Sequence, residues 1–171
     1  MIKSISGIRG TIGGSVGDSF TPIDIVKFTS AYAKFILDQN NTSKKIIVGR
    51  DARISGKFVS DLVCGTLVGC GFDVVDVGLS TTPTIEVSVQ REKASGGIIL
   101  TASHNPKQWN ALKLLNNKGE FISSKDGLKI LELAEKNDYH FSTIDKIGSL
   151  SFDNSQNDKH IEDVLNLNLV N

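Results

Sequence analysis

The sequence predicts an α/β protein: a three-layer α/β/α domain around a mixed, mostly parallel sheet. Three short apolar segments, at residues 46–48, 72–78 and 97–100, have the composition of buried strands. Apolar residues at helical spacing lie before the first of these segments and between them. An alternation of strand and helix requires crossover connections, which make neighbouring strands parallel and cover both faces of the sheet with helices.

The helix limits are indicated by capping residues. Thr21-Pro22-Ile23-Asp24 has a capping threonine, a proline in the first turn and an early carboxylate. Ile25, Phe28, Tyr32 and Phe35 follow at helical spacing. The three predicted helices extend over residues 21–40, 58–69 and 82–93.

After residue 106 the pattern changes. Residues 111–115, a turn at 116–119 and residues 120–122 predict a hairpin that adds an antiparallel strand. Ser123 and Asp126 then form a capping box, which predicts another helix. Residues 137–158 are polar and rich in turn formers, and helical spacing resumes over residues 160–167.

The composition excludes several classes of protein. The 19 Lys and Arg residues balance the 19 Asp and Glu residues, which argues against binding to nucleic acid. The apolar stretches are too short to span a membrane, and the first residues lack the apolar core of a signal peptide. Cys64 and Cys70 lie in one helical pattern and are expected to be buried thiols in a reducing cytoplasm, not a disulfide or metal site.

Three polar segments can reach one edge of the predicted sheet: the N-terminal loop Ser6–Gly10, Gly49–Arg53 and Thr101–Pro106. Ligands of parallel sheets bind beyond the carboxyl ends of the strands. Arginine side chains match the oxygens of a phosphate, and glycines allow backbone N–H groups to approach an anion. The residues therefore indicate a phosphate-handling site with Ser103 as the candidate nucleophile.

Each of these features also has a simpler interpretation. The glycines of the first segment can be turn residues, Arg50 and Arg53 can pair with surface carboxylates, and His104 can cap a turn. Ser103 and His104 are adjacent, and adjacent side chains of a strand point to opposite faces. Both can therefore serve one site only if they lie on an irregular loop.

Other catalytic signatures are missing. A P-loop ending in Gly56-Lys57 would need a glycine where Asp51 stands and a serine or threonine where Phe58 stands. No G-x-G-x-x-G segment follows a strand, and Ser103 lacks the flanking glycines of a nucleophile elbow. The three histidines are too widely separated for a typical zinc site.

In combination, these segments closely resemble the α-D-phosphohexomutases, which include phosphoglucomutase, phosphomannomutase and phosphoglucosamine mutase. Ser6–Gly10 is similar to the family's N-terminal arginine loop, and Gly49–Gly56 to its second landmark. Thr101–Pro106 matches the phosphoserine loop residue for residue. Trp109–Lys113 resembles the segment that follows, with Ala111 in place of the usual glycine.

The resemblance implies a reversible shift of phosphate between the 1- and 6-positions of a hexose phosphate, through a bisphosphorylated sugar. Ser103 would carry the phosphoryl group, and Mg²⁺ would bind through the Ser103 phosphate. Either His104 or Lys113 would act as general acid and base, and Arg9 would balance the charge. The residues implied in binding phosphate or substrate are Arg9, Gly10, Arg50, Asn105 and Lys113.

Members of this family have four domains, and the chain resembles only the first. Residues 1–140 would be domain I, and residues 141–171 would be its end and a connecting helix toward domain II. The D-G-D-x-D-R loop of domain II, which supplies the other metal ligands, does not occur in the chain. The expected partners are therefore a hexose phosphate and domains II–IV of a longer chain, and the fragment is expected to be inactive alone.

The sequence is also compatible with two other functions. The chain could be a stand-alone module of the same fold that binds a sugar phosphate or a protein. A phosphatase or kinase-like transferase using Ser103 is less favoured, because the sequence offers no complete set of metal ligands.

Overall fold

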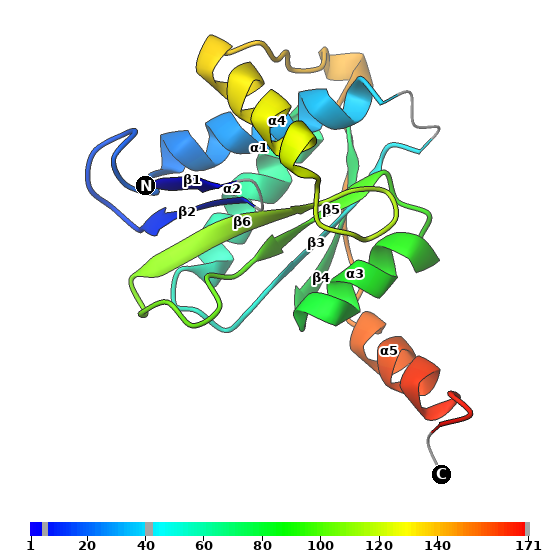
Figure 1. Ribbon diagram of the computed structural model, residues 1–171. Coiled ribbons are helices and arrows are strands. Elements are labelled where there is room, and N and C mark those ends of the chain that lie inside the picture. The colour runs from blue at the N-terminus through cyan, green and yellow to red at the C-terminus, as the bar shows by residue number, and fades with distance from the viewer. Residues whose placement is uncertain (5–6, 40–42, 170–171) are drawn as a thin grey trace.

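A seven-stranded mixed sheet lies between two layers of helices in the computed structural model, which describes residues 1–4, 7–39 and 43–169 (Figure 1). The strands are β1 (Ile2–Ser4), β2 (Gly7–Thr11), β3 (Lys45–Arg50), β4 (Asp73–Leu79), β5 (Gly96–Leu100), β6 (Trp109–Leu115) and β7 (Leu150–Phe152). The helices are α1 (Pro22–Leu37), α2 (Gly56–Gly69), α3 (Thr82–Arg91), α4 (Ser124–Lys136) and α5 (Gln156–Leu165), with a 3₁₀ turn at Ile144–Lys146.

The strand order is β1-β2-β6-β5-β3-β4-β7. β5, β3, β4 and β7 are parallel to one another, whereas β6, β2 and β1 are added in antiparallel pairs. The predicted α/β class and mixed sheet are therefore confirmed. The loops after β3 and β5 leave the sheet at neighbouring positions, because these two strands are parallel partners.

The N-terminal segment was expected to be a loop, and this prediction was wrong for the part that the structure describes. Gly7–Thr11 is strand β2, paired with β6, while Ser6 lies outside the described residues. The partner strand lies about a hundred positions away in the sequence. Local spacing in five residues, two of them glycine, does not reveal such a pairing.

Three smaller predictions after residue 115 also differ from the structure. Residues 120–122, the predicted second strand of the hairpin, form one isolated bridge, Leu115 with Phe121, and no strand. The segment expected to be turn-rich contains β7, whose three exposed residues pair with β4. The last helix begins at Gln156, four residues before the apolar spacing that predicted it.

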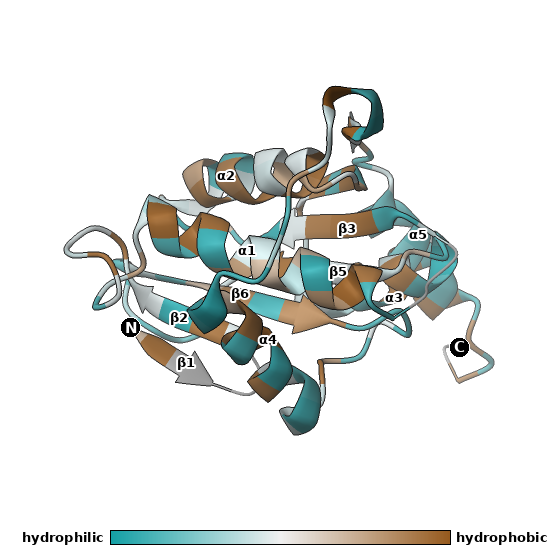
Figure 2. Cartoon of the chain, turned by 90° about the horizontal axis from the view of Figure 1, so that it is seen from above, coloured by the Kyte–Doolittle hydropathy of each residue, from teal (hydrophilic) through white to brown (hydrophobic). Residues whose placement is uncertain are grey.

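The helices cover the two faces of the sheet unequally. α1, α2 and α4 lie side by side over one face, with α1 in the middle (Figure 2). They enclose the larger core, in which Phe20, Phe28, Tyr32 and Phe72 are the largest fully buried side chains. On the other face α3 packs on β3 and β5. The neighbouring surface over β2 and β6 is where the candidate site lies.

Tyr32 links α1 to the two strands at the middle of the sheet. Its single hydroxyl proton is donated mainly to the Leu115 carbonyl oxygen at 2.7 Å and is shared with the Gly97 carbonyl oxygen at 3.2 Å. The side chain is fully buried, and this burial raises the pKa of the phenol far above its usual value. A Cβ atom at Gly96 would lie 2.2 Å from this hydroxyl, so the position requires glycine.

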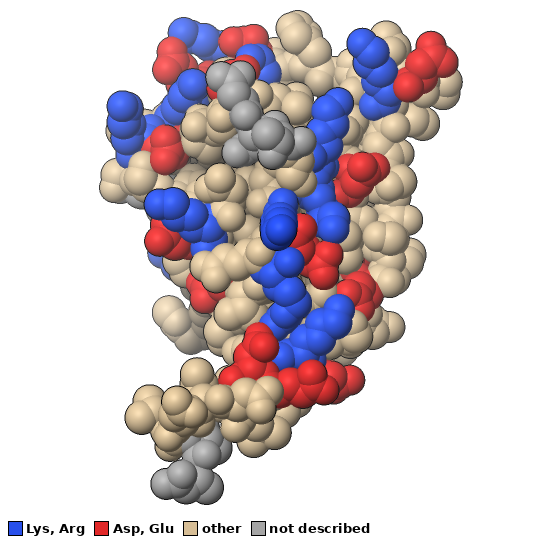
Figure 3. Space-filling view, turned by 90° about the vertical axis from the view of Figure 1, so that its right-hand side faces the viewer, with Lys and Arg blue, Asp and Glu red and all other residues tan. Residues whose placement is uncertain are grey.

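α5 is attached to α3 by a buried glutamine. Gln156, with 0% of its surface exposed, accepts hydrogen bonds from Ser88 at 3.0 Å and Arg91 at 2.6 Å. Its amide donates to Glu92 at 3.1 Å and Asp153 at 2.8 Å. Figure 3 shows this side of the molecule, where Lys and Arg side chains alternate with Asp and Glu side chains down to the C-terminal helix. The start of α5 is therefore fixed by polar contacts.

Both cysteines are buried free thiols, as predicted. Burial raises the pKa of Cys64 to about 12 and that of Cys70 to about 11. The reactive thiolate is therefore scarce near neutral pH. The cytoplasmic location stays a prediction. Within residues 1–4, 7–39 and 43–169, no helix has the length and apolar character needed to cross a bilayer.

Replacing Tyr32 with phenylalanine is expected to lower the free energy of unfolding by about 1–3 kcal/mol, because buried hydrogen bonds are lost without replacement. Denaturant unfolding of the chain measures this loss. Tyr139→Phe is the matched control: its hydroxyl donates a long hydrogen bond of 3.3 Å to Asn137 near the surface, and the expected change is about 0.5 kcal/mol or less. Equal losses in both variants would contradict the structural role of Tyr32.

Acid is expected to loosen α5. Hydrogen bonds from Ser155, Gln156 and Lys159 hold the pKa of the Asp153 carboxyl well below its usual range. A carboxyl group whose pKa is lower in the folded state stabilises that state at neutral pH, and this contribution is lost as the pH falls below about 4. Hydrogen exchange of the α5 amides should accelerate there more than exchange of the β3 amides.

Asp153→Asn should weaken this acid dependence, whereas the same change at exposed Asp158, in the first turn of α5, should preserve it. An Asp153→Asn chain that retains the full dependence would contradict the assignment.

Candidate functional site

A pocket of about 350 Å³ opens beyond the carboxyl end of β5, beside β2 and β6. The loop after β5 forms one wall, and two antiparallel strands form the other. The lining residues are Gly7 and Arg9 of β2, residues 101–105 of the loop, and Ala111, Leu112 and Lys113 of β6. Two of the three segments predicted to reach this edge of the sheet therefore contribute residues to one pocket.

Strand alternation brings the two cationic side chains of the pocket together. Ile8 and Leu112 are paired across β2 and β6 and belong to the core under α1 and α4. Arg9 and Lys113, each one position further along, have side chains on the opposite face of the sheet, where both line the pocket. Gly7 lies opposite Lys113 with φ +142°, and a Cβ atom there would be 2.1 Å from the Leu112 carbonyl oxygen. Glycine therefore allows β2 to approach β6 this closely.

Ser103 is exposed and lies in the left-handed region of backbone conformation, with φ +53°. Its N–H group donates a hydrogen bond to Thr101 Oγ1 at 3.0 Å. Its hydroxyl oxygen accepts one from Lys113 Nζ at 2.8 Å. The candidate nucleophile is thus open to solvent and in contact with an ammonium group.

Arg9 has a free donor inside the protein. Its Nε atom is buried and has no hydrogen-bond partner among the residues that the structure describes. An unsatisfied buried donor is costly, and for a charged group the cost is larger. An anion bound in the pocket could supply the missing acceptor.

His104 and Asn105 follow Ser103 on an irregular loop, and both line the pocket. The Asn105 N–H group donates to the Ala102 carbonyl oxygen at 3.0 Å, which closes a turn around Ser103. Because the loop is irregular and not a strand, Ser103 and His104 border the same pocket although they are neighbours in the chain.

Gly10 and Arg50, which were also expected to bind phosphate, do not line the pocket. Gly10 faces the core, where a Cβ atom would lie 3.1 Å from Phe20. The Arg50 guanidinium donates to the Asp51 carbonyl oxygen at 3.3 Å. A role for either residue in binding phosphate stays a prediction.

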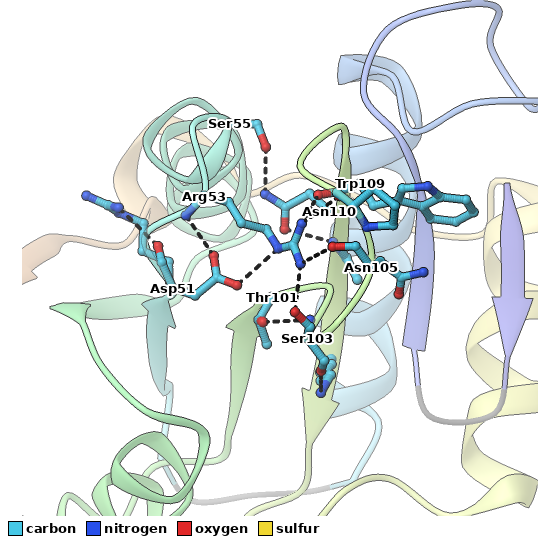
Figure 4. A network of polar contacts seen from close by, with 12 residues as sticks. Asp51, Arg53, Ser55, Thr101, Ser103, Asn105, Trp109 and Asn110 are labelled. Carbon is cyan, nitrogen blue, oxygen red and sulfur yellow. Dashed lines mark hydrogen bonds and ion pairs between the residues drawn. The ribbon is translucent and has the colours of Figure 1, made fainter.

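Arg53 lies at the centre of the polar network beneath the Ser103 loop (Figure 4). It pairs with Asp51 at 3.2 Å, as its simpler interpretation expected. It also donates to three backbone carbonyl groups of the loop and to that of Trp109, the first residue of β6. The sequence does not reveal this second role, because the acceptors are backbone atoms about 50 positions away, which any residue type would provide.

Asn110 extends the same network. Its buried amide donates to the Ser55 hydroxyl at 2.9 Å, linking the start of β6 to the residue that precedes α2 (Figure 4). The side chains of Arg53 and Asn110 therefore join the segment after β3 to the loop after β5 and to the start of β6.

The pocket residues alone do not fit a Mg²⁺ site. Mg²⁺ is usually bound by one or two carboxylates together with phosphate oxygens and water. None of the pocket residues is Asp or Glu. Across the described parts of the chain, no three His, Cys, Asp or Glu side chains converge in a way that could hold a metal ion. The pocket offers the Ser103 oxygen and cationic groups, which suit an anion.

Comparison with known proteins agrees with this geometry. The family described as "Phosphoglucomutase/phosphomannomutase, alpha/beta/alpha domain I" matches residues 2–141. A phosphoglucomutase/phosphomannomutase of Thermococcus kodakarensis is 33% identical over 143 residues, covering 82% of this chain and 31% of that protein. A probable phosphoglucosamine mutase of Methanosphaera stadtmanae is 32% identical over 166 residues, covering 96% of this chain and 36% of that protein.

Solved structures share the fold. A phosphoglucomutase/phosphomannomutase family protein of Burkholderia thailandensis superimposes with a TM-score of 0.79 at 21% identity, over 94% of this chain and 34% of that one. A putative phosphomannomutase of Thermus thermophilus gives 0.74 at 27% identity, over 89% of this chain and 32% of that one. The chain thus spans about a third of the length of these relatives.

Arg9→Met is expected to weaken binding of inorganic phosphate to the chain about tenfold or more, because a hydrogen bond to a charged group contributes about 1.5–3 kcal/mol. Amide chemical shifts of residues 101–113, followed during a phosphate titration, measure the affinity. Lys136→Met is the control, since Lys136 is exposed on α4 and pairs with Glu132 at 2.6 Å. Phosphate binding that is insensitive to Arg9 would contradict the assignment.

Proposed function

The chain belongs to the phosphoglucomutase/phosphomannomutase family, to its α/β/α domain I, and on this premise we propose that it is the phosphoserine-bearing domain of a phosphohexomutase. The observation that carries the proposal is the contact between the exposed Ser103 hydroxyl and Lys113 Nζ, at 2.8 Å, in a pocket that Arg9 also lines. We keep the division into residues 1–140 and a terminal segment 141–171 as part of this proposal.

The reaction would be a reversible shift of phosphate between the 1- and 6-positions of a hexose phosphate. A free sugar hydroxyl attacks the phosphorus on Ser103; the new sugar O–P bond forms and the Ser103 Oγ–P bond breaks. The bisphosphorylated sugar then reorients so that its other phosphate faces Ser103, and this phosphoryl group is transferred back to Ser103. Such transfers depend mainly on positioning and on neutralising the charge of the moving group.

The two candidate acid–base groups can be given different roles. The 2.8 Å contact of Lys113 Nζ supports a role at the serine oxygen, where an ammonium group stabilises the negative charge that develops as the Oγ–P bond breaks. This leaves His104, which borders the pocket beside Ser103, to accept the proton of the attacking sugar hydroxyl. Arg9 would then bind a phosphoryl oxygen through its Nε–H group, which has no acceptor among the described residues.

The chain's own contribution to a Mg²⁺ site would be an oxygen of the Ser103 phosphate. Carboxylate ligands would have to come from a part of a longer protein, which agrees with relatives about three times the length of this chain. We therefore expect the 171 residues to lack turnover of a hexose monophosphate by themselves.

A stand-alone sugar-phosphate-binding module is the second candidate. Its support is that the pocket combines cationic side chains with no carboxylate among its lining residues. Such a module would bind the sugar phosphate but would take no phosphoryl group from it, so transfer to Ser103 distinguishes the two functions.

In a longer protein that contains this chain together with the carboxylate ligands of Mg²⁺, incubation with a hexose 1,6-bisphosphate is expected to phosphorylate Ser103, located by mass spectrometry of peptides. Ser103→Ala should abolish the modification, because the acceptor atom itself is removed. Ser124→Ala is the matched control, since Ser124 is exposed at the start of α4. Phosphate on another residue, or binding of the sugar without any transfer, would contradict the proposal.

A further inference from the structure

The guanidinium group of Arg53 uses all five of its N–H donors inside the protein. The acceptors are Asp51 Oδ2 at 3.2 Å and the carbonyl oxygens of Ser103, Asn105, Pro106 and Trp109 at 2.8, 2.8, 2.9 and 3.0 Å. The side chain is 11% exposed. No donor remains for a ligand from solvent, so this arginine acts on the loop and not on a phosphate.

These contacts help to fix the backbone conformation at Ser103. Its N–H group is bound by Thr101 Oγ1 at 3.0 Å, and its carbonyl oxygen by Arg53 Nη2 at 2.8 Å. With the peptide groups on both sides held, the direction of the Cα–Cβ bond is set. The conformation so held, with φ +53°, is one that residues other than glycine disfavour. Without contacts from residues outside the loop, such as Arg53, the loop is not expected to retain this conformation.

We propose that Arg53 is a positioning residue, which holds Ser103 in its left-handed conformation and so directs the hydroxyl toward Lys113 and the open pocket. The effect on phosphoryl transfer rests on the proposed function of Ser103. The effect on the loop does not, and it can be measured separately.

Lysine cannot replace Arg53 in this role. The five acceptors surround a planar group whose donors have fixed directions, whereas a lysine ammonium has three donors on a flexible chain. Asp51 supports the same arrangement: its Oδ1 accepts the Arg53 backbone N–H at 3.0 Å, and its Oδ2 accepts Nε–H. The carboxylate thus orients the guanidinium, which in turn orients the loop.

The first measurement is hydrogen exchange of the chain by NMR, comparing Arg53→Lys and Arg53→Met with Lys57→Met. Lys57 is an exposed residue of α2, paired with Asp61. We expect the protection of the Ser103 amide to fall about tenfold or more in both Arg53 variants, since the lost bonds involve a charged donor. The β3 amides and the Lys57 control should change about twofold or less. The carbon shifts of Ser103 should also leave the left-handed range.

Two outcomes of this measurement would overturn the proposal. Unchanged protection of the Ser103 amide in Arg53→Met would show that the loop holds itself. An equal fall at Ser103 and in β3 would show a general loss of stability. If Arg53→Met does not fold, the same comparison is made with Arg53→Lys, whose charge is retained.

The second measurement is the rate of phosphoryl transfer from a hexose 1,6-bisphosphate to Ser103 in the longer protein that contains this chain and the carboxylate ligands of Mg²⁺. At saturating sugar the rate is expected to fall about 100-fold in Arg53→Met, as misplacement of a reacting group by about 1 Å does, with little change in the half-saturating concentration. Transfer at the unaltered rate would overturn the positioning role. If Ser103 of the unaltered longer protein accepts no phosphoryl group, the proposed function fails, while the exchange measurement on the chain still decides the role of Arg53.

Discussion

Ser103 lies in a backbone conformation that its own side chain disfavours, and the geometry of the pocket depends on the groups that hold it there. The constraint is distributed over distant parts of the chain. Arg53 follows β3, Thr101 precedes the serine on the same loop, and Lys113 comes from β6. The parallel pairing of β3 with β5 and the antiparallel pairing of β5 with β6 place these residues beside one another. The sheet therefore builds the site as much as the loop does.

The location of the pocket follows from the unequal covering of the sheet. The face over β2 and β6 that bears Arg9 and Lys113 lies beside the area on which α3 packs, and it remains accessible. The opposite side of the same strands is buried under α1 and α4 through Ile8 and Leu112. Strand alternation thus separates a cationic surface from an apolar core within a few residues.

Much of the fold was predictable from local patterns. Thr21 and Ser123 cap α1 and α4 as their sequence contexts indicate, and the apolar segments around Val48 and Ile98 are central strands. What could not be predicted depends on partners far away in the chain: β2 needs β6, β7 needs β4, and Arg53 binds carbonyl groups that any residue type would provide. The candidate site was recognisable from Thr101–Pro106, but not how its backbone is held.

The two outer strands of the sheet are both very short: β1 and β7 have three residues each in the described structure. An exposed strand edge is a template on which another polypeptide can add by main-chain pairing. Here the longer inner strands are screened by neighbours that offer few unpaired backbone groups. β7 exposes Leu150 and Phe152, but a strand of three residues offers few backbone groups with which another chain could pair. The short outer strands therefore protect both edges of the sheet against aggregation.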